Sequence, residues 1–424
     1  MSYLPSVILV LLAVAGVWVS SRMFGHPISP FSVFYGVWFF TLALFFLRLV
    51  EYTPVRAQAW RLIVLNLVSF GFGWMLAYLF QRPAMSNWKT EVATERVSPE
   101  RLRRVIYVSF ALGMVGLAEF LRNVQGVLGL ATYLTAPNEI REAMATGGGL
   151  DTEVQPLNWL NVLTVVLCAY YLRVTRGQRR KFVWAILLIS ILSTFFMEDR
   201  ARFFFAVLWS AYVLVPVRGW NRRKLLVTGL VLAVVLFMQF FFVATLLGKI
   251  VGNYPVIMES ANVSEEFLPL LTPYTSLTGG CPALQAYLDS LPETTSGAMT
   301  FYPAYKVLRL FNPSLKALPA VPDPVAIPFE FNAFPWLYEF YTDFGVAGVI
   351  LCPFCVAFLC GLIYFHMLRS QSLYGLYANG LLAFCLTFSF YGNHLSRGPV
   401  WYLLAVGFPI ALYVTRPVPA LAQR

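Results

Sequence analysis

The chain has 424 residues, of which 59% are apolar, 17% aromatic and only 12% charged, and its net charge is +11. This composition excludes an ordinary soluble domain and indicates a polytopic membrane protein, because apolar runs repeatedly approach the roughly twenty residues that cross a bilayer. The positive charge is explained by basic loops that anchor in anionic lipid headgroups, so it does not indicate nucleic-acid binding.

In chain order, the apolar runs predict an all-α polytopic protein with about 11 (10–12) transmembrane helices in a single integral membrane domain, residues 1–424. The expected spans are residues 3–21, 28–47, 62–81, 105–121, 157–172, 182–197, 203–217, 225–247, 344–368, 373–393 and 400–415. The first span has neither a basic n-region nor a small-residue cleavage site, so we expect it to be retained rather than removed as a signal peptide.

Basic residues predict the orientation of these spans. The loops 82–104, 173–181 and 218–224 carry 6, 5 and 4 Lys or Arg residues, which places them in the cytoplasm by the positive-inside rule. Because successive spans cross the membrane in opposite directions, this assignment puts 19 basic residues inside and 12 outside. Three arginines of the first hairpin are then outside, against the rule. The N-terminus is expected outside and the C-terminus inside.

Seven of the outer cations are expected at span ends or in outer loops. The positive-inside rule predicts few Lys and Arg residues in such places. They are Arg141, Arg200, Arg202, Lys249, Lys306, Arg309 and Arg397. A set of cations around one outer cavity indicates an anionic ligand. The span interiors hold no Asp, Glu, Lys or Arg and show no inverted repeat, which argues against an ion-coupled transporter and favours chemistry at the outer surface.

The longest outer segment comprises residues 248–335, 88 residues between the eighth and ninth spans. It has too few long apolar runs for a core of its own, so we expect a partly helical periplasmic lid packed on the helix bundle. Within it, residues 301–311 predict a short helix in the interface plane with Lys306 and Arg309 on one face. A second outer segment, residues 123–156, predicts a short charged helix around Arg141.

The six cysteines of the chain add little. Five lie in expected spans, and Cys281 in the long outer loop has no evident disulfide partner. The CxxC at Cys352 and Cys355 has no histidine nearby, and the outer loops contain no aspartate-rich cation motif. We therefore expect neither a metal nor another cofactor.

Several stretches match one family in their order along the chain. They are Pro30-Phe31-Ser32-Val33-Phe34, Phe70-Gly71-Phe72-Gly73, Asp199-Arg200, Pro273-Tyr274, Thr300-Phe301-Tyr302-Pro303, Asn332 and Asp343-Phe344-Gly345-Val346-Ala347-Gly348. With the long loop between the eighth and ninth spans, they make most of the chain resemble oligosaccharide repeat unit polymerases of the Wzy type. One departure is Pro335, where the family often has a threonine three residues after the asparagine.

The resemblance implies a bacterial inner-membrane enzyme that acts on oligosaccharides linked to undecaprenyl pyrophosphate. Such enzymes move a growing chain onto the newest repeat unit at the periplasmic face, in the synthesis of lipopolysaccharide O-antigen, capsule or exopolysaccharide. Besides membrane lipid, the partners it implies are a polysaccharide co-polymerase that regulates chain length and a flippase.

The leaving group of this reaction is a lipid pyrophosphate, which guanidinium groups bind bidentately. The expected substrate-binding residues are Arg200, Arg397, Arg141, Lys306, Arg309, Tyr274 and Asn332. The alternative roles are ion pairs with neighbouring carboxylates for Arg141, Arg200 and Arg202, and contacts with bulk lipid phosphates for Lys306 and Arg309. Arg397 has no carboxylate within four residues, which favours phosphate as its partner.

A carboxylate or an imidazole must accept the proton of the acceptor sugar hydroxyl. The catalytic candidates are Glu339, His394 and Asp343. Aromatic residues at positions 336, 338, 340 and 341 surround Glu339, either as platforms for sugar rings or as interfacial aromatics, and apolar surroundings would raise its pKa. Asp343 is alternatively the N-cap of the ninth span. His394 is expected to hold the pyrophosphate or to transfer a proton with a pKa near neutrality.

Three other functions fit parts of this pattern. A ligase would move finished glycan from the lipid pyrophosphate to another acceptor. A glycolipid flippase or transporter would need an enclosed polar track, which the charge-free spans do not supply. A non-catalytic assembly scaffold would need no catalytic residue at all.

Overall fold

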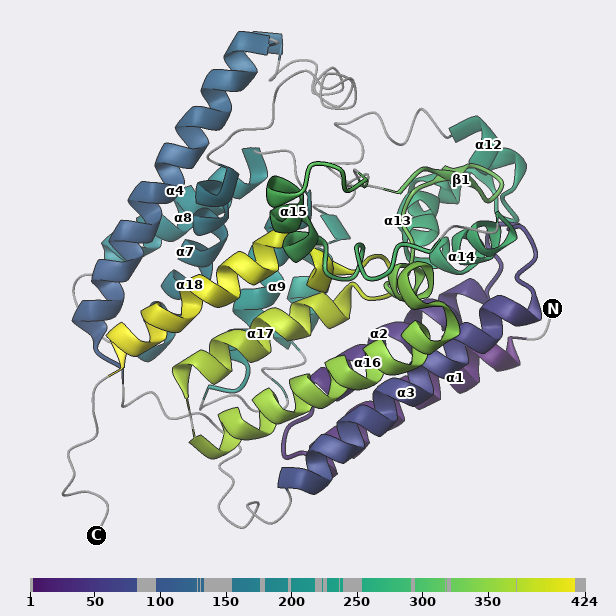
Figure 1. The fold of residues 1–424 in the computed structure, drawn as a ribbon, viewed down its shortest axis with the longest axis horizontal. Coiled ribbons are helices and arrows are strands. Elements are labelled where there is room, and N and C mark those ends of the chain that lie inside the picture. Colours follow the sequence, from purple (N-terminus) through teal and green to yellow (C-terminus); the bar gives the residue numbers. More distant parts are fainter. Residues whose placement is uncertain are drawn as a thin grey trace. The chain divides into compact units, whose positions relative to one another are not determined.

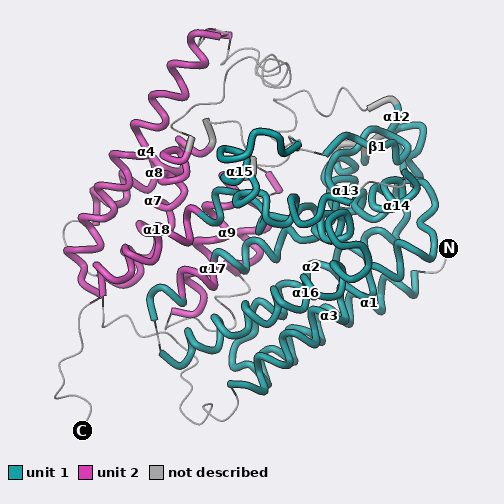
Figure 2. Tube along the Cα trace, viewed as in Figure 1, with its two compact units in different colours: residues 1–90, 252–375, 381–401 teal, residues 91–251, 376–380, 402–424 magenta. Residues whose placement is uncertain are grey.

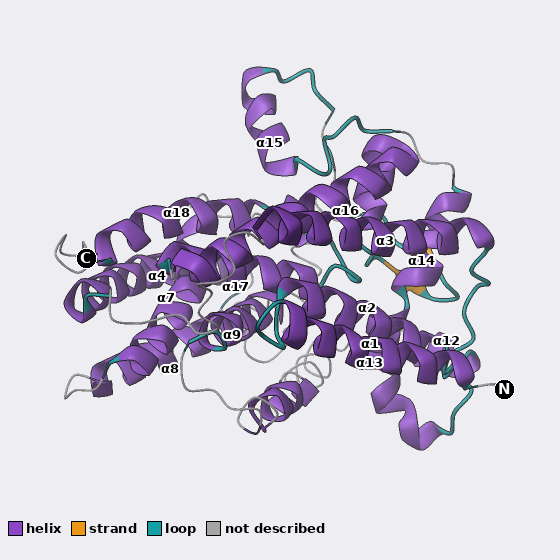
Figure 3. Cartoon of the chain, turned by 90° about the horizontal axis from the view of Figure 1, so that it is seen from below, coloured by secondary structure: helices purple, strands orange, loops and turns teal. Residues whose placement is uncertain are grey.

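Figure 1 shows the fold in a computed structural model, which describes residues 3–81, 97–127, 155–175, 180–196, 200–217, 227–235, 254–290, 294–316, 322–370 and 372–415, with a few isolated residues between these ranges. Helices form nearly all of the regular structure in these ranges (Figure 3). The one sheet that they contain pairs β1 (Val325–Ala326) with β2 (Glu330–Phe331) in antiparallel orientation. The predicted all-α class is therefore confirmed.

The helices follow one another as α1 (Leu4–Met23), α2 (Pro30–Phe45), α3 (Ala57–Gln81), α4 (Pro99–Val127), α7 (Gln155–Val174), α8 (Arg180–Phe196), α9 (Arg200–Leu214), α12 (Tyr254–Glu259), η2 (Glu265–Phe267), α13 (Leu268–Thr278), α14 (Gly280–Asp289), α15 (Tyr302–Phe311), α16 (Leu337–Ser370), α17 (Leu373–Thr387), η3 (His394–Ser396) and α18 (Gly398–Val414). The labels η mark short 3-10 helices.

Five of these helices are long and apolar enough to cross a membrane: α1, α3, α4, α7 (from Pro156) and α16. Four shorter apolar helices, α2, α9 (from Arg202), α17 and α18, accompany them, and α8 coincides with the expected span at residues 182–197. The expected span at residues 225–247 lies in large part outside the described residues. These helices support the membrane character, whereas the number of eleven spans and their orientation stay predictions.

The chain divides into two compact units, coloured separately in Figure 2. Unit 1 comprises residues 1–90, 252–375 and 381–401, and unit 2 comprises residues 91–251, 376–380 and 402–424. The chain thus passes between the units within α17 and within α18. The single membrane domain expected from the sequence stays a prediction.

In unit 1, α3 and α16 pack closely because glycines face the partner helix. A Cβ atom on Gly73 would collide with the carbonyl oxygen of Phe354, and one on Gly361 would meet Ala77. Side-chain-free surfaces allow transmembrane backbones to approach closely and gain van der Waals contact, which drives helix association in lipid. This packing fixes the position of α16, whose first turns carry the candidate site.

Buried polar groups then connect the start of α16 to the rest of unit 1. The Trp336 indole donates to Asn66 Oδ1 of α3 (2.8 Å), and the Trp336 backbone N–H donates to the carbonyl of Ser389 (2.8 Å). The Trp38 indole of α2 donates to the Ser389 hydroxyl (2.8 Å). Because buried donors need partners, these bonds define where the chain enters α16 and where it leaves α17.

The long outer segment expected at residues 248–335 is partly helical, since its described residues include α12, α13, α14 and α15. Within unit 1, α13 packs on α2 and α14 packs on α3. The short helix expected at residues 301–311 is confirmed as α15, which begins with a proline at its second position, where the absent N–H costs no hydrogen bond.

In unit 2, α4 and α7 join through small and polar residues. Asn161 donates to the carbonyl of Gly113 (2.9 Å), and Thr164 donates to the Ser109 hydroxyl (2.9 Å). A Cβ atom on Gly113 would collide with the Asn161 side chain. Such contacts are typical of helices that associate in lipid, where apolar burial alone gives little attraction.

Candidate functional site

Glu339 lies in the first turn of α16, ahead of a break in that helix. Gly345 has φ 61° and ψ −146°, a conformation that residues with a Cβ rarely adopt, and it separates residues 337–344 from the apolar helix 346–370. Glu339 therefore precedes the apolar part of α16, which is long enough to cross a membrane. The site is at the boundary between this apolar helix and the segment 294–336 of unit 1.

Two residues of the turn between α17 and α18 contact the Glu339 carboxylate. The Asn393 amide donates to Glu339 Oε2 (2.9 Å), and Arg397 Nη2 is 3.6 Å from Oε1. Glu339 is only 6% exposed, whereas 37% of the Arg397 side chain is exposed. The guanidinium thus reaches solvent on one side and a buried carboxylate on the other.

The turn that carries Asn393 and Arg397 is held by its own hydrogen bonds. Asn393 Oδ1 accepts from the Leu395 N–H (3.2 Å) and so caps η3, while the Ser396 hydroxyl donates to the Asn393 carbonyl (2.8 Å). Asn393 therefore uses both ends of its amide, one for the turn and one for Glu339. This places Arg397 at a defined distance from the carboxylate.

The ionisation of Glu339 reflects opposing influences. Burial raises its pKa, while the Arg397 charge and the nearby polar side chains of Ser396 and Asn393 lower it, and burial prevails to give a pKa of about 7. Desolvation penalises the carboxylate more than one half-exposed cation compensates. Glu339 can accordingly both accept and release a proton near neutral pH.

A small open pocket of about 20 Å³ lies over this pair. Its lining residues are Met299, Tyr302, Leu318, Pro322, Glu339, Ser396 and Arg397. Such a volume holds about one water molecule. Because four of the seven lining residues come from the segment around α15, that segment covers the carboxylate and the guanidinium.

Arg397 corrects one expectation from the sequence. We expected its only available anion to be a phosphate, because no acidic residue lies within four positions, yet Glu339 of α16 is its neighbour. The partner is 58 residues away along the chain, and only the packing of α16 against the turn after α17 brings the two together. Arg397 remains part of the candidate site, as a member of an ion pair.

His394 also differs from its expectation. Its ring packs edge-on against Phe384 (5.4 Å) and Phe388 (5.5 Å), and burial together with the nearby Arg397 charge lowers its pKa to about 3. The imidazole is therefore neutral at physiological pH, and the expected pKa near neutrality is wrong. A neutral ring beside two phenyl rings has no charge with which to hold pyrophosphate.

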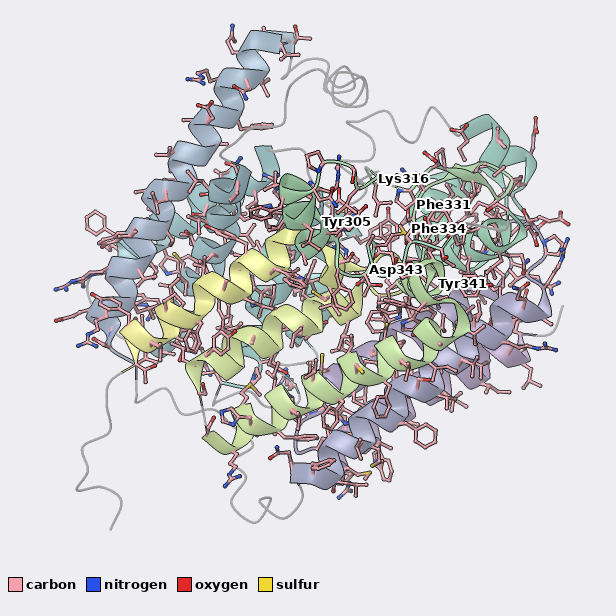
Figure 4. The ribbon with its side chains drawn as sticks, in the orientation of Figure 1. Tyr305, Lys316, Phe331, Phe334, Tyr341 and Asp343 are labelled. Carbon is pink, nitrogen blue, oxygen red and sulfur yellow. The ribbon has the colours of Figure 1, made fainter. Side chains whose placement is uncertain are left out.

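Asp343 does not act as a helix cap for the apolar helix, as one interpretation of the sequence proposed. Its carboxylate accepts from the Thr295 hydroxyl, from the Met299 N–H (3.2 Å) and from the Thr300 N–H (2.6 Å). Asp343, labelled in Figure 4, thus binds the loop that leads into α15. These hydrogen bonds give the buried carboxylate a structural role, and its catalytic role stays a prediction.

The aromatic residues around Glu339 are mostly core residues. Trp336 and Phe340 are 1% and 2% exposed, and Tyr338 stacks on Phe334 with ring centroids 4.6 Å apart. Of the four aromatic residues, only Tyr341 is partly exposed. Of the two alternatives, the platform for sugar rings is excluded for Trp336, Phe340 and Tyr338, because these rings are buried in the protein.

The remaining binding candidates of unit 1 are not among the described residues that line the Glu339 pocket. The Tyr274 hydroxyl donates to the Leu44 carbonyl (3.0 Å) and accepts from the Leu49 N–H (3.2 Å), so it connects α13 to the end of α2. Asn332 is exposed after β2. Lys306 lies over the ring of Tyr302 at 5.1 Å, and Arg309 Nε donates to the Leu315 carbonyl (3.3 Å).

The other predicted cations belong to unit 2 or lie outside the described residues. Arg141 and Lys249 lie outside them, as do Glu198 and Asp199. Arg200 begins α9, and its side chain is also outside what the structure describes. Arg202 is buried, with its guanidinium 5.2 Å from the ring centre of Trp159. The clamp expected around Arg200 stays a prediction.

Two residues that contact Glu339 were not among the sequence candidates. Asn393 and Ser396 both lie in the turn 392–399, beside His394 and Arg397, so the presence of four polar residues in a short loop between apolar helices was an available signal. For Met299 and Tyr302 of the pocket, the amino-acid sequence contains no pattern that distinguishes them from other residues of the segment 248–335.

The described residues contain no group of three or more His, Cys, Asp or Glu side chains that could hold a metal ion. Cys352 is partly buried and Cys355 is exposed in α16, both as free thiols. No family model, curated protein or solved structure matches the chain. The site is accordingly interpreted from its own chemistry.

Proposed function

We propose that the chain is a membrane glycosyltransferase that polymerises oligosaccharide repeat units carried on undecaprenyl pyrophosphate, at the periplasmic face of the bacterial inner membrane. The observation that carries the proposal is the pair of Glu339 and Arg397 in one pocket at the start of an apolar helix. A base with a pKa near neutrality and an anion-binding guanidinium are the two groups that transfer from a lipid pyrophosphate requires.

In this proposal, the hydroxyl oxygen of the acceptor sugar attacks the anomeric carbon of the growing chain. The bond between that carbon and the pyrophosphate oxygen breaks, and its electron pair leaves with the lipid pyrophosphate. The hydroxyl proton passes to the Glu339 carboxylate, which later releases it to solvent. A carboxyl with a pKa of about 7 suits both steps, since the ideal pKa of a catalytic base is close to the working pH.

Arg397 would bind the pyrophosphate oxygens and offset the charge that develops on them as the bond breaks. Its guanidinium is half-exposed and 3.6 Å from Glu339, so it can turn towards an incoming anion without leaving a buried position. When it does so, its stabilisation of the carboxylate weakens and the pKa of Glu339 rises further. Binding of the donor would thus make Glu339 a stronger base.

The position of the site supports a substrate with a lipid anchor. Glu339 is six residues before Gly345, after which the apolar helix begins, so the pocket is close to the level at which a pyrophosphate headgroup would lie above its polyprenyl chain. The ligase alternative shares this chemistry and differs only in the acceptor.

The test is an assay of the purified full chain with a single lipid-linked repeat unit as donor and acceptor, with products separated by length. We expect a ladder of two, three and more repeats on undecaprenyl pyrophosphate, and no ladder from the Glu339→Gln variant. Transfer only to a lipid A core oligosaccharide supplied in the same assay would indicate a ligase. Unreacted substrate with either acceptor would overturn the proposal.

A further inference from the structure

Helix α15 presents its apolar side chains away from the protein. Val307, Leu308, Leu310 and Phe311 are all exposed, the last two by 80% and 82%. On the other side of the helix, Tyr302 lines the Glu339–Arg397 pocket and Arg309 donates to the Leu315 carbonyl. An amphipathic helix of a soluble protein turns its apolar face inward, so α15 has the reverse arrangement.

Within the described residues of unit 1, this apolar face is left uncovered. Figure 3 shows α15 standing away from α3 and α16 on loop connections, and α15 has no buried residue. Its fold is maintained by the segment that follows: the Tyr305 hydroxyl, labelled in Figure 4, donates to the Lys316 carbonyl (2.8 Å). A contiguous exposed apolar patch of this kind marks an interaction surface.

The charges within and just after α15 are all positive. Lys306, Arg309 and Lys316 lie in or just after α15, and residues 299–317 contain no Asp or Glu. Cations along the edge of an apolar helix face complement the phosphates of a lipid surface, with the apolar side chains entering the acyl boundary. A protein partner would instead have to present acidic groups opposite these cations.

The loop that precedes α15 attaches the start of this helix to α16. Asp343 binds the Met299 and Thr300 N–H groups, and Gly297 packs so closely on Phe344 that an added Cβ atom would lie 3.1 Å from the ring. These contacts are made immediately before Gly345, where the apolar helix 346–370 begins. The start of α15 is therefore held beside the start of the apolar helix 346–370.

We propose that α15 is a membrane-seated lid, with its apolar face in the lipid surface and its polar face over the Glu339–Arg397 pocket. The pocket as it stands holds about one water molecule, so a sugar ring enters only when the segment around Met299 and Tyr302 moves. The lid role rests on the proposed function. The contact with lipid does not, and it is measured without substrate.

The experiment uses the full chain with its native cysteines replaced, reconstituted in vesicles of phosphatidylethanolamine and phosphatidylglycerol that contain a lipid with a nitroxide on its acyl chain. An environment-sensitive fluorophore is attached after Phe311→Cys on the apolar face or, as the matched control, after Lys306→Cys on the polar face of the same helix. We expect the nitroxide to quench the label at position 311 at least about threefold more than the label at 306, and aqueous iodide to show the opposite order.

Equal quenching by iodide at both positions, with little quenching by the nitroxide, would show that α15 stands in water and would overturn the proposal. Protection of position 311 from both quenchers would also overturn it, because the face would then be covered by protein, either a second copy or another partner. Replacing phosphatidylglycerol by phosphatidylcholine should lower the nitroxide quenching if the cations contribute. A polymerase assay that fails while the quenching pattern holds would reject the proposed function alone.

Discussion

At the scale of single residues, Glu339 combines deep burial with a cation 3.6 Å away. Burial favours the protonated carboxyl and Arg397 favours the carboxylate, and the net result is a pKa of about 7. Asp343 is also buried, but its oxygens accept three hydrogen bonds from the loop before α15.

The Glu339→Gln variant should lose polymer formation by a factor on the order of a hundred or more, because an amide cannot accept the proton. In the wild type, turnover should rise with pH through about 7 and level off above it, since only the ionised form is a base. A pH–rate profile of the purified protein measures both effects. Glu330→Gln, an exposed residue of β2, is the control and should leave the profile unchanged.

The Glu339→Gln variant should be at least as stable as the wild type at alkaline pH. The folded-state pKa of Glu339 is raised above its ordinary value of 4.5, so its protonated form stabilises the fold below about pH 4.5, and that contribution is lost as pH rises through about 7. Glutamine stays neutral throughout. Thermal unfolding of Glu339→Gln at pH 8 at or above the wild-type temperature would exclude misfolding as the cause of lost activity.

Replacing Arg397 with Gln should lower turnover by about a hundredfold, the order expected when a charge-stabilising donor is lost. It should also raise the pH midpoint of any residual activity, because the Arg397 charge lowers the pKa of Glu339. Arg397→Lys should keep the midpoint near the wild-type value and recover turnover only in part, since a point charge does not bind pyrophosphate bidentately. A turnover within a few-fold of wild type would remove Arg397 from the site.

At the scale of secondary-structure elements, the site depends on how closely α16 approaches its neighbours and on the break at Gly345. The glycines at the α3–α16 contact give α16 its position, and the break turns residues 337–344 away from the apolar helix. The loop before α15 is then bound to the same short segment through Asp343. The elements are thus coupled at one point, immediately outside the apolar helix.

Gly73→Ala should destabilise unit 1, because the added methyl group would collide with the Phe354 carbonyl and push α16 away from α3. Overpacking of this kind costs about 1–3 kcal/mol. The matched control is Gly36→Ala in α2, where a Cβ atom meets nothing within 4 Å. Thermal unfolding in detergent should show a lower midpoint for Gly73→Ala alone, and equal midpoints would contradict the packing argument.

Asp343→Asn should release the loop before α15 rather than remove a catalytic base. The Met299 and Thr300 amides, which donate to the Asp343 carboxylate, should lose protection in hydrogen exchange. Turnover should fall less than in Glu339→Gln, with an unchanged pH midpoint. Abolished turnover with normal amide protection would instead make Asp343 a catalytic residue.

At the scale of the whole molecule, the orientation of the chain in the membrane decides which side the pocket faces. The basic residues predict that loop residues 173–181 are cytoplasmic and that residues 248–335 are periplasmic. The pocket, α15 and the turn 392–399 all belong to unit 1 and would share the periplasmic side under this prediction. Five helices that are long and apolar enough to span a membrane support the membrane setting itself.

Cysteine labelling tests this orientation directly. A membrane-impermeant maleimide added to intact cells with a permeable outer membrane should modify Ser290→Cys, which follows α14 and is exposed, but not Arg179→Cys. Labelling of both after cell lysis is the control for accessibility. The reverse pattern in intact cells would place the Glu339 pocket in the cytoplasm and reject the proposed periplasmic chemistry.

The amino-acid sequence by itself determined the membrane class, the all-helical content and the presence of α15, because these depend on local composition and on the periodicity of apolar residues. It also indicated Glu339 and Arg397, each from its immediate neighbours. It could not show that they form a pair, since their contact joins positions 58 residues apart, nor that Asn393 donates a hydrogen bond to Glu339.

Only the tertiary structure assigned roles to the other candidates. His394 became a neutral ring between phenylalanines, Asp343 became the attachment of a loop, and three of the aromatic residues near Glu339 became core. The physical reason is that pKa values and hydrogen bonds depend on burial and on partners brought together by packing, which local sequence patterns do not contain. Residue type was readable from the chain, whereas the environment that gives each residue its chemistry came from the fold.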